Sequence, residues 1–219
     1  MLTARGAGTR SETDTNGCTT KSLPLGTPVK FAEGGNVLFP GTTVGTGTLA
    51  YSSWLTMQAA GEKDPSTCAY NDLALVKVAK ADSNKVNPSV PFFGGPVAPV
   101  DTNGTAPGNR VYSFGNSSLR AGIGLLSPKV GRSLGDDPTN GGWTHPVCTL
   151  TPGIPGDSGS GFMDATGHAL GVLSTLALAP RPSANGVGDL NKELAYAQAQ
   201  SGIAGLALVP GTQPFAPIW

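Results

Sequence analysis

The stretch from residue 151 to residue 161 constrains the fold of this chain more than any other. It reads Thr-Pro-Gly-Ile-Pro-Gly-Asp-Ser-Gly-Ser-Gly, and an apolar run follows it. Proline fixes the approach of the chain and glycine admits positive φ, so this stretch is a bent loop. A backbone bent this way can point successive N–H groups into one small space, which an oxygen that gains charge during acyl transfer requires. A tight Gly-Ser turn without chemistry is the alternative reading.

Length and composition favour an all-β protein with long loops. The 219 residues can form one large β domain or two small ones with a buried core. There are 32 Gly and 19 Pro, while charged residues make up only 13%. That charged share is about half the usual one, so few solvated helix faces are expected.

Charge and hydropathy exclude several function classes. Fourteen basic residues balance fourteen acidic ones without a basic run, which argues against a nucleic-acid partner. No apolar stretch is long enough to span a membrane, so we expect no membrane partner. The N-terminus, Met-Leu-Thr-Ala-Arg-Gly, has no apolar signal region. No cofactor and no metal site are expected.

The three cysteines allow one disulfide in an oxidising compartment. Cys18 and Cys68 both lie in stretches that resemble loops in the N-terminal half, so we favour a bridge between them. Three free thiols are the alternative. The spacing of the cysteines, with Cys148 as the third, does not suggest a metal site.

The N-terminal half reads as β structure that ends near an aspartate. Residues 28–57 carry alternating and β-branched positions, and residues 60–67 form a turn. Residues 68–78 then read as a short strand with Asp72 at its mouth, followed by Leu-Ala-Leu-Val. A loop aspartate that caps a strand is the structural alternative for Asp72.

The C-terminal half reads as a series of short strands after a loop-rich connection. Residues 79–109 are rich in Pro, Asn, Gly and Asp. Asp189 can cap a short helix that Gly202 ends. The expected strands are 110–115, 122–130 and 142–150, a hairpin of 161–163 with 169–174, and a last strand at 205–209, with a Pro/Gly loop at 180–188.

Two of these motifs resemble those of the chymotrypsin-like (trypsin-fold) serine proteases. The Gly-Asp-Ser-Gly string resembles the family's nucleophile loop, and Asp-Leu-Ala-Leu-Val resembles its second signature. The resemblance implies that Ser158 is the nucleophile and that Asp72 orients the general base. It also implies that the N–H groups of Gly156 and Ser158 form the oxyanion hole, and that the intervening aspartate orients the loop. An α/β-hydrolase elbow fits worse, because its last glycine would have to replace Ser160.

The resemblance implies an all-β fold of two six-stranded-type antiparallel β-barrels and a short C-terminal helix. Residues 1–90 would form an incomplete first barrel, because the family's opening strands are missing from this sequence. Residues 91–109 would link the barrels, and residues 110–219 would form the second barrel with the nucleophile loop and the helix. The family also implies a secreted monomer that acts on peptide or protein substrates.

Substrate contacts are also implied by the family. The strand segment Ser174-Thr175-Leu176 would pair with the substrate backbone. Pro152 stands six positions before Ser158, where trypsin-specific members carry an aspartate. The segment therefore offers no charge for an Arg or Lys side chain of a substrate.

The general base is missing from its expected position. The family places a histidine before the aspartate in a Thr-Ala-Ala-His-Cys type motif, but no histidine precedes Asp72. Residues 2–4, Leu-Thr-Ala, resemble the front of that motif, and Arg-Gly follows. Three residues could replace the base, but we expect His168 in a hairpin turn, His145 in a structural or pocket-wall position, and Lys77 facing solvent.

Three hypotheses follow. The first is a chymotrypsin-like serine endopeptidase homologue that is truncated or altered at its general base. The second is a non-catalytic homologue that binds peptides or partners through the same cleft. The third is an unrelated β-sandwich or adhesive domain with a chance Gly-Asp-Ser-Gly string.

Overall fold

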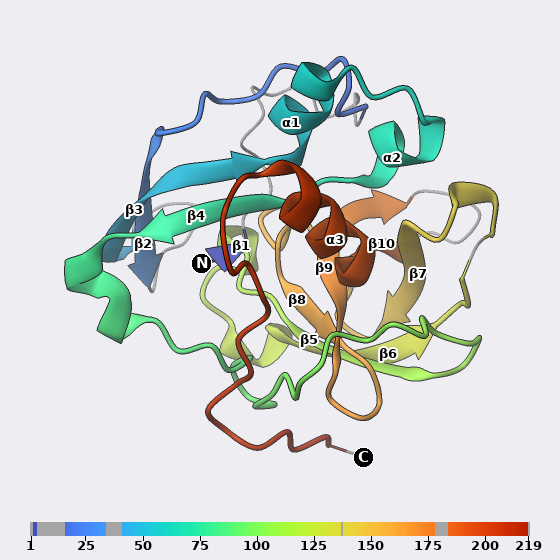
Figure 1. The fold of residues 1–219 in the computed structure, drawn as a ribbon. Coiled ribbons are helices and arrows are strands. Elements are labelled where there is room, and N and C mark those ends of the chain that lie inside the picture. The colour runs from blue at the N-terminus through green and yellow to red at the C-terminus, as the bar shows by residue number, and fades with distance from the viewer. Residues whose placement is uncertain (1, 4–15, 34–40, 137, 178–183, 219) are drawn as a thin grey trace.

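The computed structural model describes residues 2–3, 16–33, 41–136, 138–177 and 184–218. These residues form a mostly β structure with one closed six-stranded barrel, one open sheet and a C-terminal helix (Figure 1). The all-β expectation is therefore correct for the main architecture, although short helices connect the strands.

The C-terminal half forms the closed barrel. Its strands follow one another in the order β10-β7-β6-β5-β8-β9, and all pairs are antiparallel. Alternate side chains point inward and form a buried apolar core that includes Val111, Phe162 and Leu173. The strands are β5 (Arg110–Phe114), β6 (Pro128–Ser133), β7 (Thr144–Thr149), β8 (Gly161–Met163), β9 (Ala169–Ala177) and β10 (Ala184–Asp189).

The N-terminal half forms an open sheet in the order β1-β4-β3-β2. Among the described residues it does not close, so the structure has one closed barrel and one open sheet where the sequence predicted a complete barrel and an incomplete one. A sheet of so few strands cannot complete the circle that the six strands of the other half complete. The strands are β1 (Leu2–Thr3), β2 (Pro28–Glu33), β3 (Thr42–Ser52) and β4 (Ala74–Val78).

Two helices occupy stretches that the sequence did not predict as helical. Helix α1 (Ser53–Ala60) replaces the end of the expected strand at 28–57, because the Ser52 hydroxyl accepts a hydrogen bond from the Leu55 N–H and caps a helix. Helix α2 (Pro65–Tyr70) replaces part of the expected turn and strand. The Asp64 carboxylate accepts from the Thr67 N–H at its start, and proline stands in its first turn.

Three further expectations about the C-terminal half are corrected. The strand expected at 122–130 begins only at Pro128, after the 3-10 turn η3 (Gly124–Leu126). Part of the expected loop at 180–188 is strand β10, while residues 180–183 lie outside the described residues. Residues 205–209 are not a strand. The other 3-10 turns are η1 (Lys80–Lys85), η2 (Ser118–Arg120) and η4 (Pro138–Asn140).

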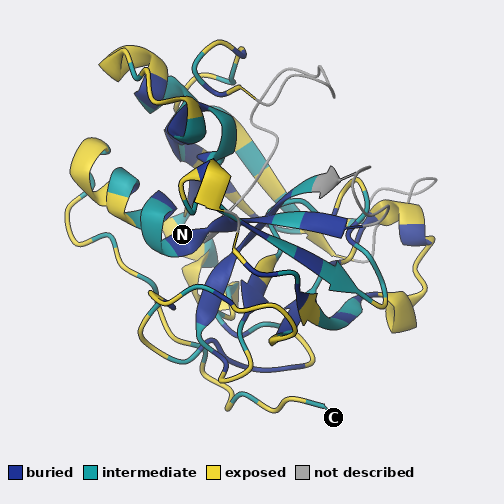
Figure 2. Ribbon diagram, turned by 90° about the vertical axis from the view of Figure 1, so that its right-hand side faces the viewer, coloured by how far each residue is buried: buried dark blue, intermediate teal, exposed yellow. Residues whose placement is uncertain are grey.

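Helix α3 (Leu190–Gln200) joins the two halves. The Asp189 carboxylate accepts from the Lys192 N–H and caps this helix, as the sequence predicts, whereas the helix ends at Gln200 rather than at Gly202. Its Leu190 and Ala197 share one buried cluster with residues of the open sheet and with Ala169 of the barrel. Figure 2 shows buried residues mostly in the strands, while the connecting loops are largely exposed. The two halves are therefore held together through a common core.

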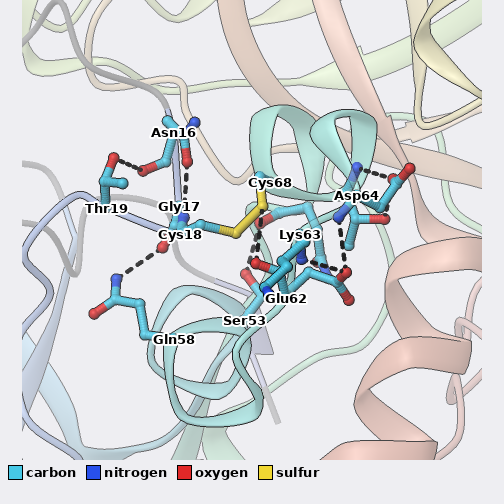
Figure 3. The surroundings of a disulfide bond; sticks show 12 residues. Asn16, Gly17, Cys18, Thr19, Ser53, Gln58, Glu62, Lys63, Asp64 and Cys68 are labelled. Carbon is cyan, nitrogen blue, oxygen red and sulfur yellow. Dashed lines mark hydrogen bonds between the residues drawn. A yellow bond between two sulfur atoms is a disulfide. The ribbon is translucent and has the colours of Figure 1, made fainter.

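The expected disulfide between Cys18 and Cys68 is confirmed (Figure 3). It ties the segment before β2 to helix α2, and the Gly17 N–H also donates to the Cys68 carbonyl at 2.8 Å. Gln58 of α1 donates to the Gly17 carbonyl at 2.7 Å. Cys148 is a free, half-buried thiol.

Candidate functional site

The loop that carries Ser158 consists of two consecutive tight turns. The Asp157 N–H donates to the Ile154 carbonyl at 2.9 Å, with Gly156 at φ +96° between them. The Ser160 N–H then donates to the Asp157 carbonyl at 3.0 Å, with Gly159 at φ +85°. Positive φ at the third position is the mark of a type II turn and suits glycine. The half-buried Ser158 therefore stands at the corner of the second turn.

Two backbone donors at this serine have no hydrogen-bond partner in the described part of the chain. Among the described residues, neither the Gly156 N–H nor the Ser158 N–H donates a hydrogen bond. Gly156 is exposed and Ser158 is half-buried, so both donors remain open to a ligand from solvent. Every backbone N–H is a strong donor that requires an acceptor, and this pair can donate to an oxygen that carries negative charge.

A buried ionic cluster fixes the loop from behind. The Asp157 side chain is fully buried, and Arg120 of η2 donates to its Oδ2 at 2.5 Å. Lys129 of β6 places its Nζ 3.1 Å from the same oxygen. The Ile154 N–H donates to Oδ2 as well, and the Ser117 N–H donates to Oδ1. One carboxylate thus ties two loops and a barrel strand together.

The ionisation of this cluster follows from burial and pairing. Burial by itself would raise the pKa of Asp157, but the hydrogen bonds from Arg120 and the Ile154 N–H hold that pKa below its usual value. Burial lowers the pKa of Lys129, and the neighbouring Asp157 opposes this effect. Asp157 is therefore ionised at neutral pH and keeps the loop anchored.

Ser117, just before η2, and Arg120 of η2 also hold the loop. The Ser117 hydroxyl donates to the Pro155 carbonyl at 2.6 Å. Arg120 donates to the Pro152 carbonyl at 2.9 Å. A Cβ at Gly156 would approach the Ser117 Oγ to 2.8 Å, so only glycine fits this turn without displacement.

Asp72 lies at the mouth of β4, between α2 and that strand. Its Oδ2 accepts a hydrogen bond from the Ser174 hydroxyl of β9 at 3.3 Å. Its N–H donates to Oε1 of Glu193 of α3 at 3.2 Å. The Ser53 hydroxyl, which bridges the Asn71 carbonyl and the Leu73 N–H, holds the backbone on both sides. Three elements thus fix the position of Asp72.

Strand β9 brings Asp72 and the serine loop to one place. The Gly159 N–H donates to the Leu173 carbonyl at 2.8 Å, and the Leu173 N–H donates to the Ser160 carbonyl at 2.8 Å. The next residue along β9 is Ser174, whose side chain contacts Asp72. Asp72 and the turn that carries Ser158 therefore both contact β9, at neighbouring residues of that strand.

Glu193 is a buried acid behind Asp72. Its side chain is completely buried, and its Oε2 has no hydrogen-bond partner among the described residues. Burial, followed by the charge of Asp72, raises its pKa well above the usual value. Glu193 therefore stays protonated to a higher pH than an ordinary glutamate, and its Oε1 accepts from the Asp72 N–H.

The segment Ser174-Thr175-Leu176 has one unpaired edge. Thr175 and Leu176 pair with Gly186 and Asn185 of β10, whereas β8 pairs with β9 only as far as Val172. Among the described residues, no strand pairs with the other edge of 174–176. That edge can accept an extended chain by strand addition.

The expected pocket residue Pro152 lies in a well-anchored segment. The buried Asn185 side chain accepts from the Gly153 N–H at 2.8 Å and donates to the Gly153 carbonyl at 3.1 Å. Pro152 itself is half-buried and carries the carbonyl that Arg120 binds. Its role in substrate binding stays a prediction.

Neither histidine is positioned to serve Ser158. His145 is 2% exposed, with Nδ1 2.6 Å from Asp136 Oδ1 and Nε2 2.8 Å from Asp189 Oδ2. His168 lies in the β8–β9 hairpin turn, where Nδ1 is 2.7 Å from the Thr166 hydroxyl. Both ring nitrogens of His145 are engaged, and Lys77 is exposed on β4. The expected structural position of His145 and turn position of His168 are both observed.

Sequence reasoning missed Ser117, Arg120, Lys129, Asn185 and Glu193. None of them belongs to a motif, and each acts through a contact with a residue far away in the sequence. A lysine inside a strand normally faces solvent, so the sequence would predict an exposed Lys129 rather than a buried one.

Among the described residues, no group of three or more His, Cys, Asp or Glu side chains is arranged to hold a metal ion. The same residues contain no helix with the length and apolar character of a membrane span.

A search with family models and a search of curated proteins found no match to this sequence. A search of solved structures found the Rv3671c protease of M. tuberculosis in its active form, at 17% identity and a TM-score of 0.41. That alignment covers 80% of this chain and 67% of the protease. A serine-to-alanine mutant of Rv3671c in an inactive form aligns at 14% identity and a TM-score of 0.41, over 74% of each chain.

Proposed function

We propose that this chain is a chymotrypsin-like serine endopeptidase homologue that binds a peptide across Ser158 and hydrolyses it very slowly. In this proposal Ser158 is the nucleophile, and the Gly156 and Ser158 N–H groups form the oxyanion hole. Asp72 takes the role of the acid that, in the family, orients a histidine. The edge at Ser174-Thr175-Leu176 and the segment at Pro152 contact the substrate.

One observation carries the proposal. The two open N–H donors at Gly156 and Ser158 adjoin a serine at the corner of an anchored turn, and β9 joins this turn to Asp72. Acyl transfer requires such donors beside a nucleophile, because the tetrahedral intermediate carries negative charge on its oxygen. A chance Gly-Asp-Ser-Gly string in an adhesive domain would not require the buried anchor at Asp157.

The slow rate follows from the missing general base. A serine hydroxyl is a weak nucleophile unless a neighbouring base takes its proton. No histidine precedes Asp72 in this sequence, and His145 and His168 are engaged elsewhere. A catalytic site without its histidine keeps only the oxyanion hole and substrate binding, about 10³–10⁴-fold over water.

Peptide binding without chemistry is the second candidate. The engagement of both ring nitrogens of His145 favours it, because no imidazole is left to replace the missing base. The unpaired edge of β9 and the open N–H donors can bind a peptide without a proton transfer.

A serine-directed fluorophosphonate distinguishes the two candidates. The purified chain is incubated with the probe over hours, and the modified residue is located by peptide mass spectrometry. The proposal predicts slow labelling at Ser158 that Ser158→Ala removes, while the neighbouring control Ser160→Ala retains it. Peptide binding together with no labelling at Ser158 would support the second candidate instead.

A further inference from the structure

We propose that the turn from Gly156 to Ser158 binds the carboxylate of a peptide C-terminus, and that Ser117 positions its donors. This inference rests on the proposed function, because it assumes that a peptide occupies the cleft. The inference adds to that function the chemical group that is bound most tightly, which is the C-terminal carboxylate of the peptide. The ligand class is a peptide with a free C-terminus, which binds at the same place as the internal stretch of chain that the proposed function hydrolyses.

The donors suit a carboxylate better than a peptide carbonyl. The Gly156 and Ser158 N–H groups have no partner among the described residues. A hydrogen bond from a backbone N–H to an ionised oxygen is about twice as strong as one to a neutral carbonyl. Successive N–H groups in a turn form concave anion sites, and such sites capture C-terminal carboxylates.

The Ser117 hydroxyl sets the direction of one donor. A trans peptide unit is planar, so its C=O and its N–H point to opposite sides. In the Pro155–Gly156 unit, the carbonyl accepts the Ser117 Oγ–H at 2.6 Å. The Gly156 N–H must therefore point away from Ser117. Without this hydrogen bond the unit can rotate and turn its carbonyl oxygen, which repels an anion, toward the ligand.

Ser117 is held firmly enough for this role. It is 2% exposed, its N–H donates to Asp157 Oδ1 at 2.9 Å, and its Oγ also accepts from the Leu119 N–H at 3.2 Å. The Ser117 side chain therefore contacts the first turn, and the Ser117 backbone contacts the buried Asp157 carboxylate. Loss of the hydroxyl removes the contact to Pro155 and leaves the contact to Asp157.

The charges behind the turn also favour an anion. Two basic side chains, Arg120 and Lys129, face a single carboxylate at Asp157. Arg120 is only 7% exposed, and its Nε has no hydrogen-bond partner among the described residues. An excess of buried basic groups is stabilised when an anion binds nearby. The cluster therefore offsets part of the cost of desolvating the incoming carboxylate.

The test compares pairs of peptides that differ only in the C-terminal group. Acetylated tetrapeptides that end in Ala, Leu or Phe are prepared as free acids and as amides, and their affinities are measured by calorimetry. Acetate alone serves as a probe for a carboxylate without a peptide. The proteins are the full wild-type chain, Ser117→Ala, and the control Ser118→Ala, which truncates the exposed neighbouring serine.

The proposal predicts that wild type and Ser118→Ala bind the acids about tenfold or more tightly than the amides. In Ser117→Ala that ratio falls to about one while amide binding persists, which a general loss of folding would not produce. Acetate competes weakly in comparison with the acids. Equal affinity of wild type for acids and amides would overturn the proposal and leave the peptide cleft intact. Labelling of Ser158 without binding of any acid would overturn it as well, whereas loss of both labelling and all peptide binding would overturn the proposed function.

Discussion

The Ser174 hydroxyl of β9 donates to Asp72 Oδ2 at 3.3 Å, and this contact joins the open sheet to the barrel beside the serine loop. The residue before it, Leu173, exchanges backbone hydrogen bonds with Gly159 and Ser160. Two neighbouring residues of one strand therefore contact Asp72 and the turn that carries Ser158. The candidate site depends on the junction of the two halves rather than on either half alone.

Asp157→Asn should destabilise the fold strongly. The substitution leaves two buried basic groups without their carboxylate, and breaking such a buried pair costs about 3–5 kcal/mol. Chemical denaturation at neutral pH measures the loss. Asp82→Asn removes an aspartate from a surface pair with Lys85 and should have little effect. Equal losses in both variants would show that the Asp157 cluster does not anchor the loop.

The same cluster predicts acid sensitivity. The pKa of Asp157 is lower in the folded chain than its ordinary value of 3.8, so its stabilisation is present above that value. It is lost as the pH falls through the folded pKa. Unfolding free energies between about pH 2 and pH 5 should therefore fall more steeply with acid for wild type than for Asp157→Asn. Parallel curves would contradict this prediction.

His145 should make the fold less stable at alkaline pH. Burial would lower its pKa, but hydrogen bonds to Asp189 and Asp136 raise it above 6.5. The stabilisation is fully present below the unfolded value and is lost as the pH rises through the folded value, with a slope of at most about 1.4 kcal/mol per pH unit. The unfolding free energy, measured by denaturation at several pH values across this range, should depend less on pH in His145→Gln. Equal slopes in wild type and His145→Gln would contradict this prediction.

Glu193→Gln should stabilise the chain above the ordinary pKa of glutamate. The folded pKa of Glu193 is raised, so wild type loses stability as the pH rises from about 4.5 toward that folded value. The amide of the variant would keep an oxygen that can accept from the Asp72 N–H and would carry no ionisable group. The difference in melting temperature between variant and wild type should therefore grow with pH. A variant that is less stable than wild type at every pH would show that Glu193 is needed as a carboxyl group.

Much of the barrel could be predicted because its signals are local. The alternation in 110–114 and 144–149, the hairpin around residues 164–167 and the cap at Asp189 all depend on neighbours in sequence. Helix α1 could not be predicted as easily, since its apolar and aromatic residues suit a strand and only the cap at Ser52 stops β3. The Ser52 hydroxyl at its start and the left-handed Gly61 at its end together favour the helix over that local propensity.

The candidate site was predictable only where a motif carried it. Ser158, Gly156 and Asp72 belong to short strings that resemble a known family, so the sequence points to them directly. Ser117, Lys129 and Glu193 act through contacts between distant elements, and no spacing in the sequence marks such contacts. The residues that orient and anchor the candidate site could therefore be identified only from the three-dimensional structure.

The most direct test is the rate at which the purified chain hydrolyses a peptide substrate, compared with Ser158→Ala. The account predicts a rate that is very low in the wild-type chain and that changes little in the variant, because the oxyanion hole remains while no base activates the serine. Peptide binding should also persist in Ser158→Ala. A normal protease rate that Ser158→Ala abolishes would contradict the account, and single replacements of His145, His168 and Lys77 would then identify the base.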